Sequence, residues 1–109
     1  MHQQRLPFRR FVVSDRSMEP TLVNGQALIT VRSDSAKVGE LRVFQHPYRP
    51  GFWLVKRVAE TRGPQTMWVL SDNVAVQTLD SRELGSLPVD GSFRVLWALP
   101  TWLVRIDRG

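Results

Sequence analysis

The chain has 109 residues, the length of one domain, with 15 basic and 10 acidic residues and a formal net charge of +5. It has no cysteine and only two histidines, His2 and His46, which excludes disulfides, thiolate zinc sites and a cysteine nucleophile. Because two distant histidines cannot complete a structural zinc site, we expect no metal and no cofactor.

Short apolar and β-branched runs, separated by glycine, proline, aspartate and asparagine, predict β-strands along most of the chain. In chain order the predicted strands are Phe11–Val13, Gln26–Val31, Leu41–Phe44, Trp53–Ala59, Thr66–Leu70 and Phe93–Trp97. No long amphipathic helical pattern, repeat or linker accompanies them. We therefore expect a mainly β fold, a compact sandwich or partly closed barrel, in one domain over residues 1–109 with its core at about 10–100.

The basic residues suggest no particular partner. Thirteen are arginines scattered along the chain, which is typical of a solvated surface rather than a nucleic-acid site. No segment has the roughly 20 apolar residues of a membrane span, and the N-terminus lacks the apolar stretch of a signal peptide, so we expect a cytoplasmic protein. The group around Trp97 and Trp102 leaves peripheral membrane contact open, although core packing is its more ordinary role.

Without cysteine, nucleophilic catalysis would have to use a serine or threonine with a suitable base. His46 lies where a predicted strand enters a turn, and we interpret it as a surface loop histidine. Strand alternation places Lys56 on the same face as Leu54 and Val58, with Arg57 on the opposite face. If that face is buried, desolvation favours a neutral amine that can act as a base; otherwise the amine reaches water at a strand edge.

Ser17 begins the segment Ser17-Met18-Glu19-Pro20-Thr21, which follows the first predicted strand. Pro20 restrains the residue before it to extended or turn geometry, so a loop presents Ser17. Such a loop can offer the hydroxyl together with its own backbone N–H, which is half of an oxyanion hole. The alternative is an ordinary turn serine.

A third polar segment runs through Ser71-Asp72-Asn73, a turn signal, to Thr78-Leu79-Asp80-Ser81-Arg82-Glu83-Leu84-Gly85. Asp80 and Arg82 are expected to pair with each other or with Arg57. The alternative is a polar surface loop, in which such pairs contribute little.

In this order, the segments resemble the signal peptidase I family of Ser–Lys proteases. The family's nucleophile box S-M-x-P-T matches residues 17–21, and its lysine box K-R-V matches residues 56–58. Its last box, G-D-N followed by S-x-D-S-R-x-x-G, matches residues 71–85. In this box the chain has Ser71 in place of the first glycine and one extra spacer residue. A looser strand box matches Gly39-Glu40-Leu41-Arg42-Val43-Phe44. The similarity spans about residues 10–100 and implies the β fold shared by signal peptidases and repressor-type proteases, without an inserted second domain.

The resemblance implies that Ser17 is the nucleophile and Lys56 the general base. It implies that Thr78 orients the lysine amine and that the Ser17 N–H stabilises the oxyanion. Asp80, Arg82 and Arg57 are expected to brace the site from behind these residues. A shallow substrate groove is expected near Met18 and Pro20. Two residues before the nucleophile, where many members have serine or glycine, this chain has Asp15, which when ionised can only accept hydrogen bonds.

The function implied is that of a serine endopeptidase that removes an N-terminal signal or propeptide from a precursor protein. The short chain without a membrane anchor is similar to the bacterial proteases that mature nickel-type superoxide dismutase. The expected partner is therefore a precursor protein and not nucleic acid, with the oligomeric state open. The alternatives are a catalytically degenerate relative and a non-enzymatic basic binding module. A repressor-type self-cleaving domain is disfavoured because its Ala-Gly or Cys-Gly cleavage dipeptide is absent.

Overall fold

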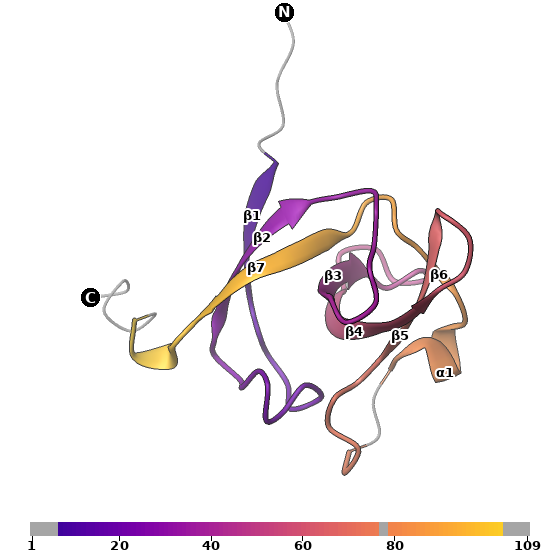
Figure 1. The fold of residues 1–109 in the computed structure, drawn as a ribbon. Helices are drawn as coiled ribbons and strands as arrows, with labels where there is room; N and C mark the ends of the chain where they lie inside the picture. Colours follow the sequence, from indigo (N-terminus) through magenta and orange to yellow (C-terminus); the bar gives the residue numbers. More distant parts are fainter. Residues whose placement is uncertain (1–6, 77–78, 104–109) are drawn as a thin grey trace, which may run out of the picture.

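The computed structural model describes residues 7–76 and 79–103, which form one antiparallel seven-stranded sheet (Figure 1). The strands are β1 (Phe8–Val12), β2 (Ala27–Arg32), β3 (Leu41–Gln45), β4 (Trp53–Thr61), β5 (Thr66–Leu70), β6 (Leu87–Pro88) and β7 (Phe93–Leu99). A short helix, α1 (Ser81–Leu84), lies between β5 and β6. The order across the sheet is β1-β2-β7-β3-β4-β5-β6, so the predicted mainly β class is confirmed, in one sheet rather than two.

The predicted strands agree with the observed ones most closely where apolar alternation is strong. Residues 66–70 form β5 with the predicted bounds, whereas β1 begins three residues before the predicted strand. The two-residue β6 and the single turn of α1 were not predicted, because neither is long enough to display a period of its own. No helix within the described ranges has the length and apolar character needed to cross a bilayer.

The sheet coils strongly, as right-handed strand twist requires of many strands in series. Although β1 and β4 are not hydrogen-bonded neighbours, Phe11 of β1 stacks against Trp53 of β4 with ring centroids 5.1 Å apart. Phe93 at the start of β7 completes the aromatic cluster, 5.5 Å from Phe11. The edge strand β1 is thereby brought close to the first half of β4.

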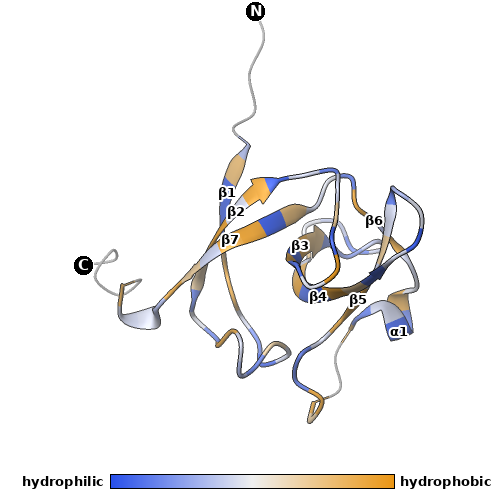
Figure 2. Cartoon of the chain, viewed as in Figure 1, coloured by the Kyte–Doolittle hydropathy of each residue, from blue (hydrophilic) through white to orange (hydrophobic). Residues whose placement is uncertain are grey.

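Alternation along the strands separates two buried clusters. One contains Phe44, Leu54 and Val58 and packs β3 and β4 against β5 and β6. The other contains Met18 and Val43 and packs the loop after β1 against the sheet. Figure 2 shows hydrophobic residues recurring along β2, β4 and β7 with hydrophilic ones between them, while α1 is mainly hydrophilic.

A buried arginine anchors the loop between β2 and β3. Arg42 of β3 has no exposed surface and donates from Nη1 to the Ser33 carbonyl at 2.7 Å and to Ser92 Oγ at 3.0 Å. Its Nη2 donates to the Ser35 carbonyl and forms a salt bridge with Glu40 at 3.1 Å. Because all of its nitrogens are hydrogen-bonded, this cation is tolerated in the interior.

Candidate active site

Ser17 and Lys56 are brought together by the fold. Lys56 Nζ donates a hydrogen bond of 2.8 Å to Ser17 Oγ, although the two residues are 39 positions apart in the chain. Each residue is only 1% exposed. A nucleophile and a base within hydrogen-bond reach of each other are the minimum geometry for an activated serine.

The loop that carries Ser17, residues 13–26 between β1 and β2, is closed at its base. The Val13 N–H donates to the Gln26 carbonyl at 2.9 Å, and the Gly25 N–H donates to the Val13 carbonyl at 2.7 Å. Gly25 has a φ of +92°, a conformation that residues with a Cβ rarely adopt. Ser17 lies in a turn and not in a helix, and the Glu19 N–H donates to the Arg16 carbonyl at 3.2 Å across it.

Burial controls the protonation of Lys56. The side chain lies on the same face of β4 as Leu54 and Val58, as strand alternation predicts. Desolvation lowers the pKa of Lys56 from its ordinary value of 10.5, while the negative charges of Asp15 and Asp80 oppose that shift. The lowered pKa favours the neutral amine, the form that can accept a proton.

Asp15 contacts the serine directly. One of its carboxylate oxygens, Oδ1, accepts from the Ser17 hydroxyl at 2.9 Å and from the Ser17 backbone N–H at 3.1 Å. The side chain of Asp15 therefore occupies the backbone donor that the sequence assigned to an oxyanion. The residue itself lies at an exposed position.

The Ser71-Asp72-Asn73 turn is hydrogen-bonded to the loop that carries Ser17. The Asn73 N–H donates to the Ser17 carbonyl at 2.9 Å, and Asn73 Nδ2 donates to the Arg16 carbonyl at 2.8 Å. Asp72 Oδ2 accepts from Thr21 Oγ1 at 2.7 Å. The sequence indicated this turn only through its match to the family's last box. That match was the signal that pointed to Asp72 and Asn73 as residues that hold the Ser17 loop in place.

Arg57 pairs with Asp72 and not with Asp80. Arg57 follows Lys56 in the chain, and its Nε and Nη2 donate to the two carboxylate oxygens of Asp72 at 2.9 and 2.8 Å. Hydrogen bonds from Arg57 and Thr21 hold the pKa of Asp72 below its usual 3.8 against the opposing effect of burial. Asp72 therefore links the lysine strand to the serine loop.

Asp80 and Arg82 pair with each other, one of the two arrangements expected. Arg82 Nη2 lies 3.0 Å from Asp80 Oδ2, and that carboxylate also accepts from the Ser71 N–H at 3.0 Å while capping α1. Burial raises the pKa of Asp80, but the hydrogen bonds from Arg82 and Ser71 outweigh it and keep the pKa below 3.8. Thr78, the residue expected to orient the lysine amine, lies outside the described residues.

A shallow groove reaches the serine loop between β1 and β4, with a volume of about 40 Å³. Its lining is apolar except for Ser14 and Asp15, and the other lining residues are Phe11, Val12, Val13, Leu28, Val43, Trp53, Leu54 and Val55. Met18, expected near the substrate, is fully buried beneath the loop, with its sulfur accepting from the Asp72 N–H. Pro20 is exposed, after a cis peptide bond, and is not part of this lining.

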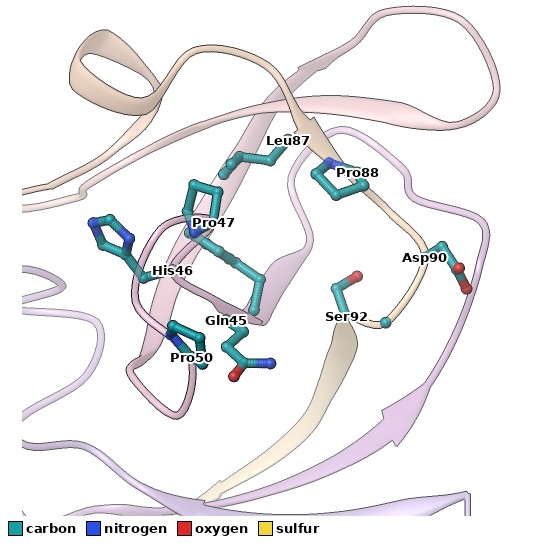
Figure 3. Close-up of a pocket in the computed structure, with 10 residues that line it drawn as sticks. Gln45, His46, Pro47, Pro50, Leu87, Pro88, Asp90 and Ser92 are labelled. Carbon is teal, nitrogen blue, oxygen red and sulfur yellow. The ribbon is translucent and has the colours of Figure 1, made fainter.

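A larger cavity of about 300 Å³ includes neither member of the Ser17–Lys56 pair in its lining. Figure 3 shows His46, Pro47 and Pro50 on one side of it and Pro88 and Asp90 on another. His46 is buried at 8% exposure, accepts from the Tyr48 N–H and packs on Phe52, so its interpretation as a surface residue was wrong. Its ring packs edge-on against Tyr48 and Phe52 in the turn after β3, with ring centroids 6.1 and 5.9 Å away. Within residues 7–76 and 79–103, no group of three or more acidic or histidine side chains could hold a metal ion.

A buried lysine amine hydrogen-bonded to a serine hydroxyl has the geometry needed to activate a serine. The family comparison points to a peptidase. Residues 4–66 match the family model described as signal peptidase, peptidase S26, and because the match covers more than half of the chain, the protein belongs to that peptidase family. The matched segment contains Ser17 and Lys56. No curated protein and no solved structure matches the chain significantly.

Proposed function

We propose that the protein is a serine endopeptidase in which Ser17 is the nucleophile and Lys56 the general base. The observation that carries this proposal is the 2.8 Å hydrogen bond between Lys56 Nζ and Ser17 Oγ in a buried setting. Membership of the peptidase S26 family supports a peptidase function independently of that geometry. The lowered pKa of Lys56 supports its role as a base.

In the proposed reaction, Ser17 Oγ attacks a peptide carbonyl as its proton passes to neutral Lys56. The Ser17 N–H then stabilises the oxyanion of the tetrahedral intermediate. Lys56 returns the proton to the leaving amine as the peptide bond breaks, which leaves an acyl group on Ser17. Lys56 next takes a proton from water, and hydrolysis of the acyl group regenerates the serine. Thr78 orienting the lysine amine remains part of the proposal.

The substrate is proposed to bind as an extended peptide in the groove between β1 and β4. Two strand edges border this groove, because β1 is at the end of the sheet and Trp53–Val55 of β4 pair only with β3. Unpaired strand edges bind extended chains through backbone hydrogen bonds. The family resemblance implies small residues next to the cut, and the largely apolar lining of the groove suits small apolar side chains.

We further propose that the natural substrate is a precursor protein whose N-terminal signal or propeptide is removed, with nickel-type superoxide dismutase precursor as the first candidate. The sequence resemblance to the maturation proteases of that enzyme supports this choice. The groove supports this substrate only in general terms, because it suits any extended segment with a small side chain next to the cut. The basic surface is not used by the proposed chemistry.

Co-expression with the candidate precursor, followed by mass measurement of the precursor's N-terminus, tests the proposal. We expect a single shortened product with the wild type and none with Ser17→Ala or Lys56→Met, because loss of a general base costs about 10²–10⁴-fold. Matched controls are Ser35→Ala and Lys37→Met, two exposed positions in the loop between β2 and β3.

Unchanged cleavage by either dyad variant would contradict the mechanism. Cleavage of other precursors, but not of this one, would contradict only the choice of substrate. A folded wild-type protein that cleaves no peptide of a library with small residues at every position would favour the degenerate relative or the binding module.

A further inference from the structure

The contact between Asp15 and Ser17 has a consequence for catalysis. A single oxygen, Asp15 Oδ1, accepts both hydrogen bonds that Ser17 can donate, from the hydroxyl at 2.9 Å and from the backbone N–H at 3.1 Å. Lys56 Nζ meanwhile donates to Ser17 Oγ. The hydroxyl proton therefore points away from the base that should receive it.

The same N–H cannot serve a carboxylate and a substrate oxyanion at full strength. An effective oxyanion donor lies about 2.7–3.1 Å from the developing negative oxygen. Asp15 Oδ1 already lies at that distance from the Ser17 nitrogen, and a second anionic oxygen beside it would be repelled. The tetrahedral intermediate thus requires the carboxylate to leave.

Asp15 is free to leave because of where it lies. It is an exposed residue that lines the groove, and it is the only ionisable side chain in that lining. Rotating this side chain into water exposes a carboxylate that water solvates well. Desolvation of the groove by an incoming peptide would favour that rotation, since an unpaired carboxylate in an apolar site is costly.

We propose that Asp15 is a displaceable latch, a positioning residue that holds the Ser17 donors in the free protein and swings out of the groove when a substrate carbonyl takes its place. This inference rests on Ser17 being the nucleophile. It predicts that removing the carboxylate improves binding of tetrahedral ligands, the opposite of what a supporting residue would do. Neutralising Asp15 also removes one of the two charges that oppose the lowered pKa of Lys56.

The test uses a tripeptide boronic acid ending in boroalanine. Its boron adds to Ser17 Oγ as the hydroxyl proton passes to Lys56, giving a tetrahedral anionic boronate that requires the Ser17 N–H. We expect the Kd to fall about tenfold in Asp15→Ala, about 1.4 kcal/mol, and by less in Asp15→Asn, whose amide oxygen can still accept. Asp34→Asn, at an exposed position of the loop between β2 and β3, should bind like the wild type.

A second measurement follows the contact between Asp15 and Ser17 directly by NMR, without any bond being cleaved. The NMR resonance of the Ser17 amide proton should shift in Asp15→Ala, and it should also shift when the wild type binds the boronate. The pKa of Lys56, followed by NMR of its side chain, should be lower in Asp15→Ala and in Asp15→Asn than in the wild type. The isosteric Asp15→Asn variant retains the test if Asp15→Ala does not fold.

Equal or weaker boronate binding in folded Asp15 variants would overturn the latch while leaving Ser17 as the nucleophile. An unmoved Ser17 amide resonance would overturn it as well. Absence of any adduct in the wild type and in both variants, or equal binding by Ser17→Ala, would instead overturn the proposed function and the latch with it.

Discussion

Lys56 of β4 and Arg42 of β3 are direct cross-strand partners, and both cations are buried, yet their surroundings are opposite. Arg42 has a carboxylate partner in Glu40 and carbonyl and hydroxyl acceptors around every nitrogen. No carboxylate of the described residues lies within salt-bridge distance of Lys56, whose Nζ donates to a hydroxyl. The interior therefore surrounds the arginine with acceptors, whereas burial without a carboxylate partner favours a neutral lysine.

Replacing each buried cation by methionine should separate the two roles. Lys56→Met should leave the free energy of unfolding at neutral pH unchanged or raise it by ~1 kcal/mol, because the substitution replaces a desolvated amine, whose lowered pKa opposes folding, with an apolar side chain. Arg42→Met should lower it by about 3 kcal/mol, because Glu40 and several buried acceptors lose their donor. Urea denaturation of the two variants provides the measurement, and equal losses in both would contradict this assignment.

The stability of the wild type should rise with pH in the alkaline range. Because the pKa of Lys56 is lower in the folded protein than the ordinary 10.5, the unfolded chain binds a proton there that the folded chain does not. Stability attributable to Lys56 is therefore gained as pH rises from the folded-state pKa toward 10.5 and is level above it. Denaturation at a series of pH values, compared with Lys56→Met, checks this. Parallel curves for the two proteins would show that Lys56 has no lowered pKa.

Asp72→Asn should weaken the hydrogen bonds that connect β4, which carries Lys56, to the loop that carries Ser17. Asp72 accepts two hydrogen bonds from Arg57 and one from Thr21, and a charged acceptor contributes about 1.5–3 kcal/mol. With Arg57 partly exposed, we expect a loss of about 1 kcal/mol in the free energy of unfolding, together with reduced peptidase activity. Glu60→Gln, which removes the exposed pair with Arg62, is the matched control and should change stability by less than about 0.5 kcal/mol.

The carboxylate of Asp72 should also make the free energy of unfolding depend on pH in the acidic range. The pKa of Asp72 lies below 3.8 in the folded protein, so its stabilisation is fully present above 3.8 and is lost as pH falls through the lower, folded-state pKa. The wild type and Asp72→Asn should therefore differ in stability above that range and converge below it. A difference that stays constant at acidic pH would assign the effect to packing instead of charge.

Asn73→Ala should reduce activity more than stability. Its side-chain amide donates to the Arg16 carbonyl next to the nucleophile, while its backbone contact with the Ser17 carbonyl survives the substitution. A small displacement of Ser17 from Lys56 lowers kcat by about 10- to 100-fold, because reaction rates depend steeply on the alignment of the reacting atoms. Steady-state kinetics beside thermal unfolding provides the measurement. A loss of Tm in proportion to the loss of kcat would indicate a structural role alone.

Local patterns carried much of the correct sequence interpretation. Alternation over residues 53–59 was enough to place Lys56 on the face of Leu54 and Val58, because side chains on a strand point alternately to opposite faces. Strands with clear alternation were predicted within one or two residues. The short β6 and α1 were missed because neither is long enough to show a period of its own, and β6 forms only by pairing with β5.

The surroundings of individual side chains could not be predicted in the same way. Arg57 had several acidic candidates in the sequence and pairs with Asp72, and His46 is covered by aromatics that the turn folds over it. Asp15 was recognised as a departure from the family pattern, but its two contacts with Ser17 became evident only from the geometry of the loop.

The strand-rich class and the serine and lysine segments could be read from the amino-acid sequence, because composition, period and motif are properties of neighbouring residues. The three-dimensional structure was needed to show that Lys56 lies 2.8 Å from Ser17, that it is desolvated, and that Asp15 accepts both hydrogen bonds that Ser17 donates. The first two depend on the folding of the sheet, which brings together residues 39 positions apart in the chain, and the third depends on the conformation of the loop after β1.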